Sequence, residues 1–355
     1  MRELIAAIRP YPRTCVWELT PRCNLSCLHC ASSLGPRATR AGRSIDGPRA
    51  LRLCRELADL GCEYVALSGG EPLLREDWPR IAARFTELGV GVGMISNGLL
   101  ADDRAVREMV RAGVSILAVS IDGPPAVHDA IRRRAGCHRR AIEAIERARD
   151  AGLRVHAVTH LNRLNVPHLD TLHDALSALR VRTWLVQLSA PMGRMREHLE
   201  MVLAPEDVPA IASWLAAVKP RNSMYVAVGD NIGYYGPLEP VLRRRRPDER
   251  QPFWCGCSAG ILTLGIESNG GVKGCLSLQS DRFVEGNVLD RPLREIWEDE
   301  RAFAYTRRFE PKMLQGACRG CEYGELCRGG CTFMSVGATG EPGGNPYCLH
   351  RLGRA

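Results

Sequence analysis

The sequence predicts an α/β protein, with a partial (β/α)6 TIM-like barrel followed by a small cysteine-rich domain. Over the first 220 residues, short apolar runs of strand type alternate six times with stretches of helical periodicity. This alternation is typical of a parallel sheet with right-handed crossovers. Residues 255–355 then carry eight of the 15 cysteines, many glycines and little helical periodicity. Such a segment cannot build an apolar core of its own, so we expect bound metal to hold it together.

Each unit of the predicted barrel pairs a strand pattern with the helix pattern that follows it. The strand patterns are Cys15–Leu19, Tyr64–Ser68, Val90–Ser96, Ser115–Ser120, Arg154–Leu161 and Thr183–Leu188. The helix patterns are Pro48–Leu60, Trp78–Leu88, Asp103–Ala112, Arg139–Ala151, Val166–Leu179 and Pro205–Val218. A complete eight-unit barrel needs more chain than this half supplies, so we expect an open barrel whose active site lies at the carboxyl ends of the strands.

These patterns divide the chain into an N-terminal segment (1–12), the partial barrel (13–220), a linker (221–254) and the cysteine-rich domain (255–355). Arg243–Arg246 is a run of four like charges flanked by prolines, which is typical of a solvated linker. Within the last domain, helical periodicity is found at Leu293–Phe303. Only Met1–Thr14 precede the first strand, so we expect no fused peptide-recognition domain ahead of the barrel.

Composition excludes several classes of protein. A chain of 355 residues with 45% hydrophobic and 25% charged residues is globular rather than disordered. It has no run of eighteen uncharged apolar residues and no secretory signal at its start, so we expect a cytoplasmic protein without a membrane partner. The formal charge is +8, and the two arginine clusters are Arg132–Arg134 and Arg243–Arg246. Neither cluster has interleaved aromatic residues, which argues against nucleic-acid binding.

The first motif that carries chemistry is Cys23-Asn-Leu-Ser-Cys27-Leu-His-Cys30, after the first strand pattern. Grouped cysteines in a large chain of this kind indicate metal ligation rather than disulfides. Three thiolates can hold three irons of a 4Fe–4S cluster and leave the fourth iron open to another ligand. A zinc site is the alternative, but it usually has four protein ligands on two Cys-x-x-Cys arms.

Polar residues follow the later strand patterns at the point where each strand ends. They are Ser68-Gly-Gly-Glu71-Pro72, Ser96-Asn-Gly98, Ser120-Ile-Asp122-Gly123, Asn162 and Gln187. Taken singly, each is an ordinary turn. Their joint placement at the carboxyl ends indicates one active site. In the first of them, two glycines allow close approach of the backbone to a ligand, and Glu71 can accept hydrogen bonds from an amine.

The three-cysteine motif followed by Gly-Gly-Glu-Pro resembles the radical S-adenosylmethionine enzyme superfamily. The resemblance implies that Cys23, Cys27 and Cys30 ligate a 4Fe–4S cluster whose open iron binds the amino and carboxylate groups of S-adenosylmethionine. One electron from the cluster then cleaves this cofactor to methionine and a 5′-deoxyadenosyl radical. It also implies that Gly69, Gly70 and Glu71 contact the amino group of the cofactor, with help from Ser96. Ser120 and Asp122 would contact its ribose or carboxylate, and Arg132 would pair with the carboxylate. His29, where the family often has Tyr or Phe, would bring its ring near the adenine.

The C-terminal cysteines are similar, cysteine for cysteine, to the SPASM domain, an auxiliary-cluster module. The resemblance implies two auxiliary 4Fe–4S clusters, held by Cys255, Cys257, Cys275 and Cys331, and by Cys318, Cys321, Cys327 and Cys348. Cys255 lies only two residues from Cys257; if it is free, cluster one has an open iron that could bind substrate. A zinc ribbon is the alternative for the last five cysteines. Because the ligands of the two clusters interleave, we expect metal binding and folding of this segment to be coupled.

Four cysteines remain outside these sets. Cys15, Cys54 and Cys62 fall in or beside strand and helix patterns, and we expect buried, inert thiols. Cys137 lies near the active face and is a candidate hydrogen-atom donor, and the alternative is a structural cysteine at a helix start. Four histidines form no ligand cluster and are expected at strand and surface positions: His156, His160, His168 and His173.

The resemblance implies an enzyme that oxidatively modifies a ribosomally made precursor peptide, through a cross-link or a similar change. The implied partners are that peptide, a separate leader-binding protein and a flavodoxin- or ferredoxin-type electron donor. Leu276 and Ser277 stand where sulfatase-maturing members carry an aspartate base, which argues against that activity.

Two other functions stay open. Trp17–Cys23 and Leu28–Cys30 also resemble enzymes that tailor haem-like tetrapyrroles, so the alternative is radical tailoring of such a small molecule or another cofactor precursor. The non-enzyme alternative is an iron–sulfur electron-transfer or scaffold protein. A protein of that kind would need neither three-cysteine ligation nor the Gly69–Glu71 site.

Overall fold

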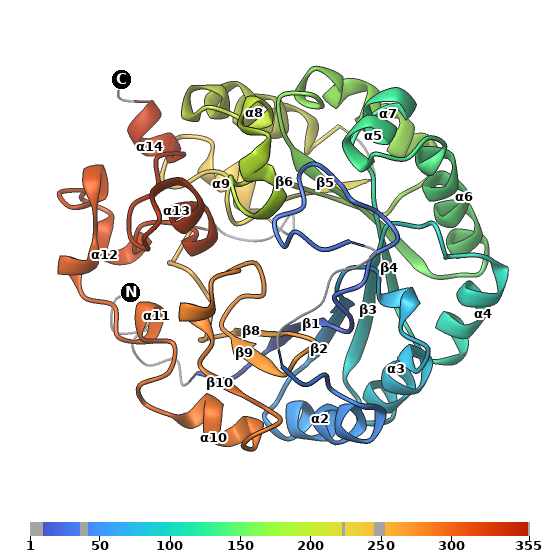
Figure 1. Ribbon diagram of the computed structural model, residues 1–355. Helices are drawn as coiled ribbons and strands as arrows, with labels where there is room; N and C mark the ends of the chain where they lie inside the picture. Colours follow the sequence, from blue (N-terminus) through green and yellow to red (C-terminus); the bar gives the residue numbers. More distant parts are fainter. Residues whose placement is uncertain (1–9, 36–41, 222–223, 245–252, 354–355) are drawn as a thin grey trace.

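The computed structural model describes residues 10–35, 42–221, 224–244 and 253–353. Its strands form one sheet in the order β10-β9-β8-β1-β2-β3-β4-β5-β6-β7, and Figure 1 shows this sheet curved into an open barrel with helices around the outside. The strands are β1 Thr14–Glu18, β2 Tyr64–Ser68, β3 Gly91–Ser96, β4 Ile116–Ser120, β5 Arg154–Leu161, β6 Thr183–Leu188, β7 Tyr225–Val228, β8 Thr263–Ile266, β9 Gly271–Lys273 and β10 Gly286–Asn287.

The barrel helices follow their strands in chain order. They are α2 Gly47–Asp59, α3 Trp78–Glu87, α4 Asp103–Arg111, α5 Pro125–Arg132, α6 Cys137–Asp150, α7 Leu169–Ala178, α8 Val208–Val218 and α9 Glu239–Arg243. The cysteine-rich part holds α10 Leu293–Glu298, α11 Ala304–Arg307, α12 Gly324–Cys327, α13 Thr332–Thr339 and α14 Leu349–Leu352. Carboxylates fix two of the starts, since Asp46 accepts a hydrogen bond from the Arg49 amide at 2.7 Å and Asp102 accepts one from Ala105 at 2.8 Å.

The six expected strands all form and pair in parallel with their neighbours in chain order, from β1 through β6. Alternation along each strand separates two faces. On β1, Trp17 is fully buried among the outer helices and meets Phe85 of α3 edge to face, with ring centroids 6.1 Å apart. Val16 and Glu18 alternate with it and face the inside of the barrel. The fold class is therefore confirmed, and the carboxyl ends of these strands form one rim.

The sheet extends beyond the six expected strands at both ends. β7 pairs in parallel with β6, although its four residues lie inside the expected linker 221–254, and β8 of the cysteine-rich part pairs in parallel with β1. Strands this short leave no clear pattern in the sequence. The pairing of β8 joins the cysteine-rich part directly to the barrel. The domain boundaries themselves stay a prediction, and residues 1–9 and Arg245–Arg246 lie outside the described residues.

One described stretch, Leu199–Val218, is long and apolar enough to cross a membrane by length and composition alone. In the fold it comprises two short 3-10 turns, the connections between them, and helix α8. α8 buries Ile211 and Leu215 in the main core. Packing in the core therefore accounts for the apolar sequence of this helix.

Candidate functional site

Cys23, Cys27 and Cys30 lie on the loop that follows β1, where the sequence placed them. Cys23 and Cys27 are buried and Cys30 is half-buried. The loop is fastened at both ends, since the Cys23 amide donates to the Gly35 carbonyl at 3.0 Å and the Leu28 amide donates to Ile131 of α5 at 2.9 Å. Burial raises the pKa of Cys23 to about 12, so the free thiol holds its proton until a metal ion replaces it.

A second chain segment, the turn after β6, also holds this loop. The Arg194 guanidinium donates to the carbonyls of Cys27 at 2.6 Å and Leu34 at 2.8 Å, and its amide donates to Cys30 at 2.9 Å. The neighbouring Gly193 has φ +54°, and a Cβ there would lie 2.2 Å from the Ala31 carbonyl oxygen. No side chain fits at that position, so the two backbones pack directly against each other.

The two glycines after β2 have the same role on the other side of the loop. A Cβ on Gly69 would lie 2.6 Å from the Thr20 carbonyl oxygen, and one on Gly70 would lie 2.1 Å from that of Arg22. The Gly70 and Glu71 amides donate to those two carbonyls at 2.8 and 2.9 Å. In this structure the glycines therefore let the backbone approach the chain's own cysteine loop, and contact with a cofactor stays a prediction.

Glu71 is fully buried between the ends of β2 and β3. Its carboxylate accepts hydrogen bonds from the Ser96 hydroxyl at 2.8 Å, the Asn97 amide at 2.9 Å and the Leu73 amide at 3.3 Å. Burial raises the pKa of Glu71 to about 7, although these hydrogen bonds favour the ionised form. Asn97 also reaches the three-cysteine loop, 2.7 Å from Asn24 Oδ1 and 3.8 Å from Cys23 Sγ.

Asp122, beyond the end of β4, is the centre of a buried charged group. Arg132 of α5 donates to its Oδ2 at 2.6 Å, and His29 Nε2 lies 3.5 Å from the same oxygen. Burial by itself would raise the pKa of Asp122, but the Arg132 charge holds it well below its usual range. Arg132 also lies 3.9 Å from Cys27 Sγ. The structure therefore brings Asp122, Arg132 and the three-cysteine loop together, as the sequence predicted.

Two histidines lie beside this group. Burial lowers the pKa of His29 to about 3, and among the described residues its Nδ1 atom has no hydrogen-bond partner. The His29 ring tilts against His160 of β5, with centroids 5.5 Å apart, and Gln187 of β6 lies 3.1 Å from His160 Nε2. His160 was expected at an ordinary strand or surface position, but its place on the inner face of β5 brings it into the site. Ser120 ends β4 and is half-buried.

The other predicted positions lie at or near this rim. Asn162 is buried in the turn after β5, where its side chain binds the backbone at His160 and Leu164. Cys137 is buried at the start of α6 in a cluster that includes Cys23 and Cys27. Its thiol donates to Asp129 at 3.2 Å, and burial raises its pKa to about 12. A hydrogen-atom donor at Cys137 stays a prediction. Cys15, Cys54 and Cys62 are buried, as expected.

Three cysteines of the C-terminal part form one group with an acidic neighbour. Burial raises the pKa of Cys275 and of Cys331. The charges of the Cys257 thiol and the Asp230 carboxylate raise both pKa values further. The chain at Cys275 crosses the inner face of β8, because a Cβ on Gly265 would lie 3.0 Å from the Cys275 carbonyl carbon. Cys275 therefore lies at the inner face of the barrel.

In the second predicted set, burial raises the pKa of Cys327 and of Cys348, and the charges of the Cys318 and Cys321 thiols raise both pKa values further. That these four residues bind one cluster stays a prediction. Cys255 has different surroundings. It is exposed, its thiol donates to the Phe253 carbonyl at 3.4 Å, and the charges that act on its pKa are those of Glu239 and Arg328.

These donor sets fit the groups that the motifs imply. Three thiols on one tightly held loop suit a cluster with one open iron. Beside them are a buried carboxylate at Glu71, an arginine at Arg132 and a ring nitrogen on His29 that has no hydrogen-bond partner within the described part of the chain. Such groups can bind the amine, carboxylate and base of a zwitterionic nucleoside. The set of Cys318, Cys321, Cys327 and Cys348 offers four thiols, the number that a fully ligated cluster needs.

Protein-family models and known relatives match this chain. A family model described as the radical SAM superfamily matches residues 17–176, and one described as an iron–sulfur cluster-binding domain, SPASM, matches residues 257–322. The chain is 30% identical to an AdoMet-dependent heme synthase from Methanosarcina barkeri, over 97% of this chain and 98% of that one. It is 31% identical to the mycofactocin maturase MftC from Mycobacterium ulcerans, over 96% and 89%.

Among solved structures, Streptococcus suis SuiB bound to its precursor peptide SuiA is similar in fold. The TM-score is 0.75 at 16% sequence identity, over 97% of this chain and 76% of SuiB.

Proposed function

Because the chain belongs to the radical SAM superfamily and carries its SPASM iron–sulfur domain, we propose that it oxidatively modifies a ribosomally made precursor peptide. Membership of this family means that the chain is an enzyme that uses 4Fe–4S clusters and S-adenosylmethionine. For the peptide substrate, the support is the 31% identity to a relative named as a mycofactocin maturase, over nearly the whole chain.

One observation favours an oxidation over a redox-neutral reaction. The chain at Cys275 crosses the inner side of β8, and β8 pairs with β1, which leads into the three-cysteine loop. Ligands of the first cluster and of an auxiliary cluster therefore follow two neighbouring strands of the barrel. An auxiliary cluster held there would be able to accept an electron from a substrate radical.

The proposed reaction balances as a two-electron oxidation. When bound, the cluster and S-adenosylmethionine supply a 5′-deoxyadenosyl radical that takes one hydrogen atom from an unactivated carbon. An auxiliary cluster held by Cys257, Cys275 and Cys331 would accept the second electron, and a base would take the proton as the new bond forms. In this scheme Glu71 and Arg132 bind the amine and carboxylate of the cofactor, and Asp122 keeps Arg132 charged and oriented through the 2.6 Å ion pair. We also propose a cytoplasmic enzyme reduced by a flavodoxin- or ferredoxin-type protein, with a separate leader-binding partner.

Tailoring of a haem-like tetrapyrrole is the second candidate. It is favoured by the 30% identity to a relative named as a heme synthase, over almost the full length of both chains. Such a substrate would undergo the same first step, loss of a hydrogen atom from carbon, so the clusters do not distinguish the two candidates.

The test co-expresses the full chain anaerobically with each short reading frame that adjoins its gene, and compares peptide masses. Loss of two hydrogens from one peptide, absent with Cys27→Ala, is the expected result, and tandem fragmentation locates the change. Cys62→Ser is the matched control, since Cys62 is buried away from every predicted ligand set. No mass shift, including in deuterated water where epimerisation would show, together with oxidation of an added tetrapyrrole, would replace the peptide by the second candidate. Unchanged 5′-deoxyadenosine formation by Cys27→Ala would refute both.

A further inference from the structure

The expected fourth ligand of auxiliary cluster one does not lie with the other three. Cys255 and Cys257 are only two residues apart, and in an extended chain their side chains would point to the same side. Gly256 between them has φ +91°, which breaks that alternation. Trp254, the residue before Cys255, is buried, and its indole nitrogen donates to the Cys327 carbonyl at 3.1 Å. This hydrogen bond holds the Trp254 side chain inward, whereas Cys255 is exposed.

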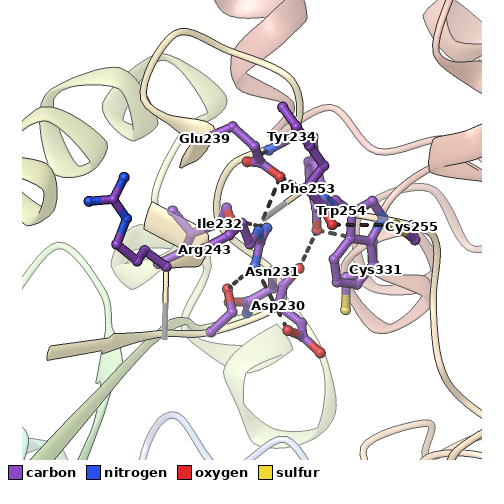
Figure 2. Close-up of polar contacts among 12 residues, drawn as sticks. Asp230, Asn231, Ile232, Tyr234, Glu239, Arg243, Phe253, Trp254, Cys255 and Cys331 are labelled. Carbon is purple, nitrogen blue, oxygen red and sulfur yellow. Dashed lines mark hydrogen bonds and ion pairs between the residues drawn. The ribbon is translucent and has the colours of Figure 1, made fainter. Parts of the chain in front are cut away.

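Another acidic residue is linked through the backbone to one of the remaining ligands. Asp230 follows the end of β7, and its backbone is tied to Cys331 by one fully buried hydroxyl. Tyr234 donates to the Asp230 carbonyl at 2.7 Å and accepts from the Cys331 amide at 3.0 Å. Figure 2 shows the Asp230 carboxylate and the Cys331 sulfur pointing to the same side, away from Cys255.

The Asp230 carboxylate is also available. Its side chain is 57% exposed, and its ion pair with Arg243 spans 3.8 Å. Arg243 itself is held firmly elsewhere, by Glu239 at 3.2 Å and by the Gly229 carbonyl at 3.3 Å. The guanidinium therefore does not need Asp230 to keep its place, and the carboxylate is free to turn toward the cysteines.

We propose that Asp230, and not Cys255, completes auxiliary cluster one together with Cys257, Cys275 and Cys331. A carboxylate carries the same single negative charge as a thiolate but is a harder donor, and iron in a sulfide cluster prefers soft sulfur ligands. The iron bound to Asp230 is therefore the most exchangeable one of this cluster. This proposal goes beyond the proposed function and holds for a peptide or a tetrapyrrole substrate alike.

The test uses the full chain with Cys23, Cys27 and Cys30 replaced by alanine, so that the first cluster does not contribute. In this background, Asp230→Ala, Cys255→Ala and the surface control Asp150→Ala are reconstituted anaerobically and assayed for iron and sulfide. Each is then mildly oxidised and examined by EPR. We expect Asp230→Ala to lose about one iron per chain and to gain the signal of a three-iron cluster. Cys255→Ala and Asp150→Ala should match the background.

Asp230→Cys separates ligand loss from misfolding. A thiol at this position should restore the full iron content without the three-iron signal, which a purely structural role of Asp230 would not produce. The proposal is overturned if Cys255→Ala gives the three-iron signal, whether or not Asp230→Ala does as well. It is also overturned if neither substitution changes iron or EPR, because the fourth iron would then have no ligand from either residue.

Discussion

Replacing Arg194 by alanine tests whether the turn after β6 holds the three-cysteine loop in place. The substitution removes two hydrogen bonds from the guanidinium, to Cys27 at 2.6 Å and to Leu34 at 2.8 Å. Hydrogen bonds from a charged donor contribute roughly 1.5–3 kcal/mol each. Because Arg194 is half-buried, water replaces part of that loss. We therefore expect docking of the loop to weaken by about 3 kcal/mol, or roughly 150-fold in the equilibrium constant.

The assay follows loss of iron from the anaerobically reconstituted enzyme under a chelator, together with the rate of 5′-deoxyadenosine formation. Arg194→Ala should release the iron of the first cluster much faster and cleave S-adenosylmethionine more slowly, with the other clusters unaffected. Arg196→Ala is the matched control, because Arg196 is exposed and donates to Pro191 at 3.1 Å. Equal iron loss in the two variants would show that the loop does not depend on Arg194.

Two further predictions concern the residues after β2. Gly70→Ala would place a Cβ 2.1 Å from the Arg22 carbonyl oxygen, so we expect it to displace the loop before Cys23, to cost roughly 1–3 kcal/mol in unfolding free energy and to lower first-cluster iron. Gly236→Ala, with its nearest atom at 3.3 Å, should retain iron, and equal iron in both would contradict the clash. For Glu71, burial raises the pKa from 4.5 to about 7, so its contribution to stability is full below about pH 4.5 and is lost as pH rises through 7. In urea unfolding of the apoprotein, wild type should lose stability relative to Glu71→Gln across this range, and a constant difference would refute the shift.

Most of the barrel could be predicted because its signals are local. The alternation of apolar residues along Tyr64–Ser68 or Arg154–Leu161 is a property of neighbouring residues, and so is the helical spacing of the segments between them. β7 and β8 could not be found in this way. Each is four residues long, and its place in the sheet depends on a partner strand distant in sequence, β6 for β7 and β1 for β8.

The candidate site likewise contains some residues that local motifs reveal and others that they do not. The cysteine spacing and the glycine-rich turns stand in short motifs, so the sequence placed Cys23, Glu71, Asp122 and Arg132 at one rim. Arg194 has no motif around it, and its contacts with Cys27 lie 167 positions away in the chain. His160 follows an ordinary strand pattern, and only the ring of His29 beside it reveals its place in the site.

The sequence by itself therefore determined the class of fold, the family and the donor atoms that can bind iron, because thiols at fixed short spacing have few other uses. Only the tertiary structure decided which donors meet. Cys255 stands two residues from Cys257 in the chain, yet the turn at Gly256 separates their surroundings, whereas Tyr234 brings Asp230 and Cys331 together across about a hundred residues. Sequence distance does not measure such contacts, since they depend on how buried side chains and backbone hydrogen bonds are satisfied once the chain has folded.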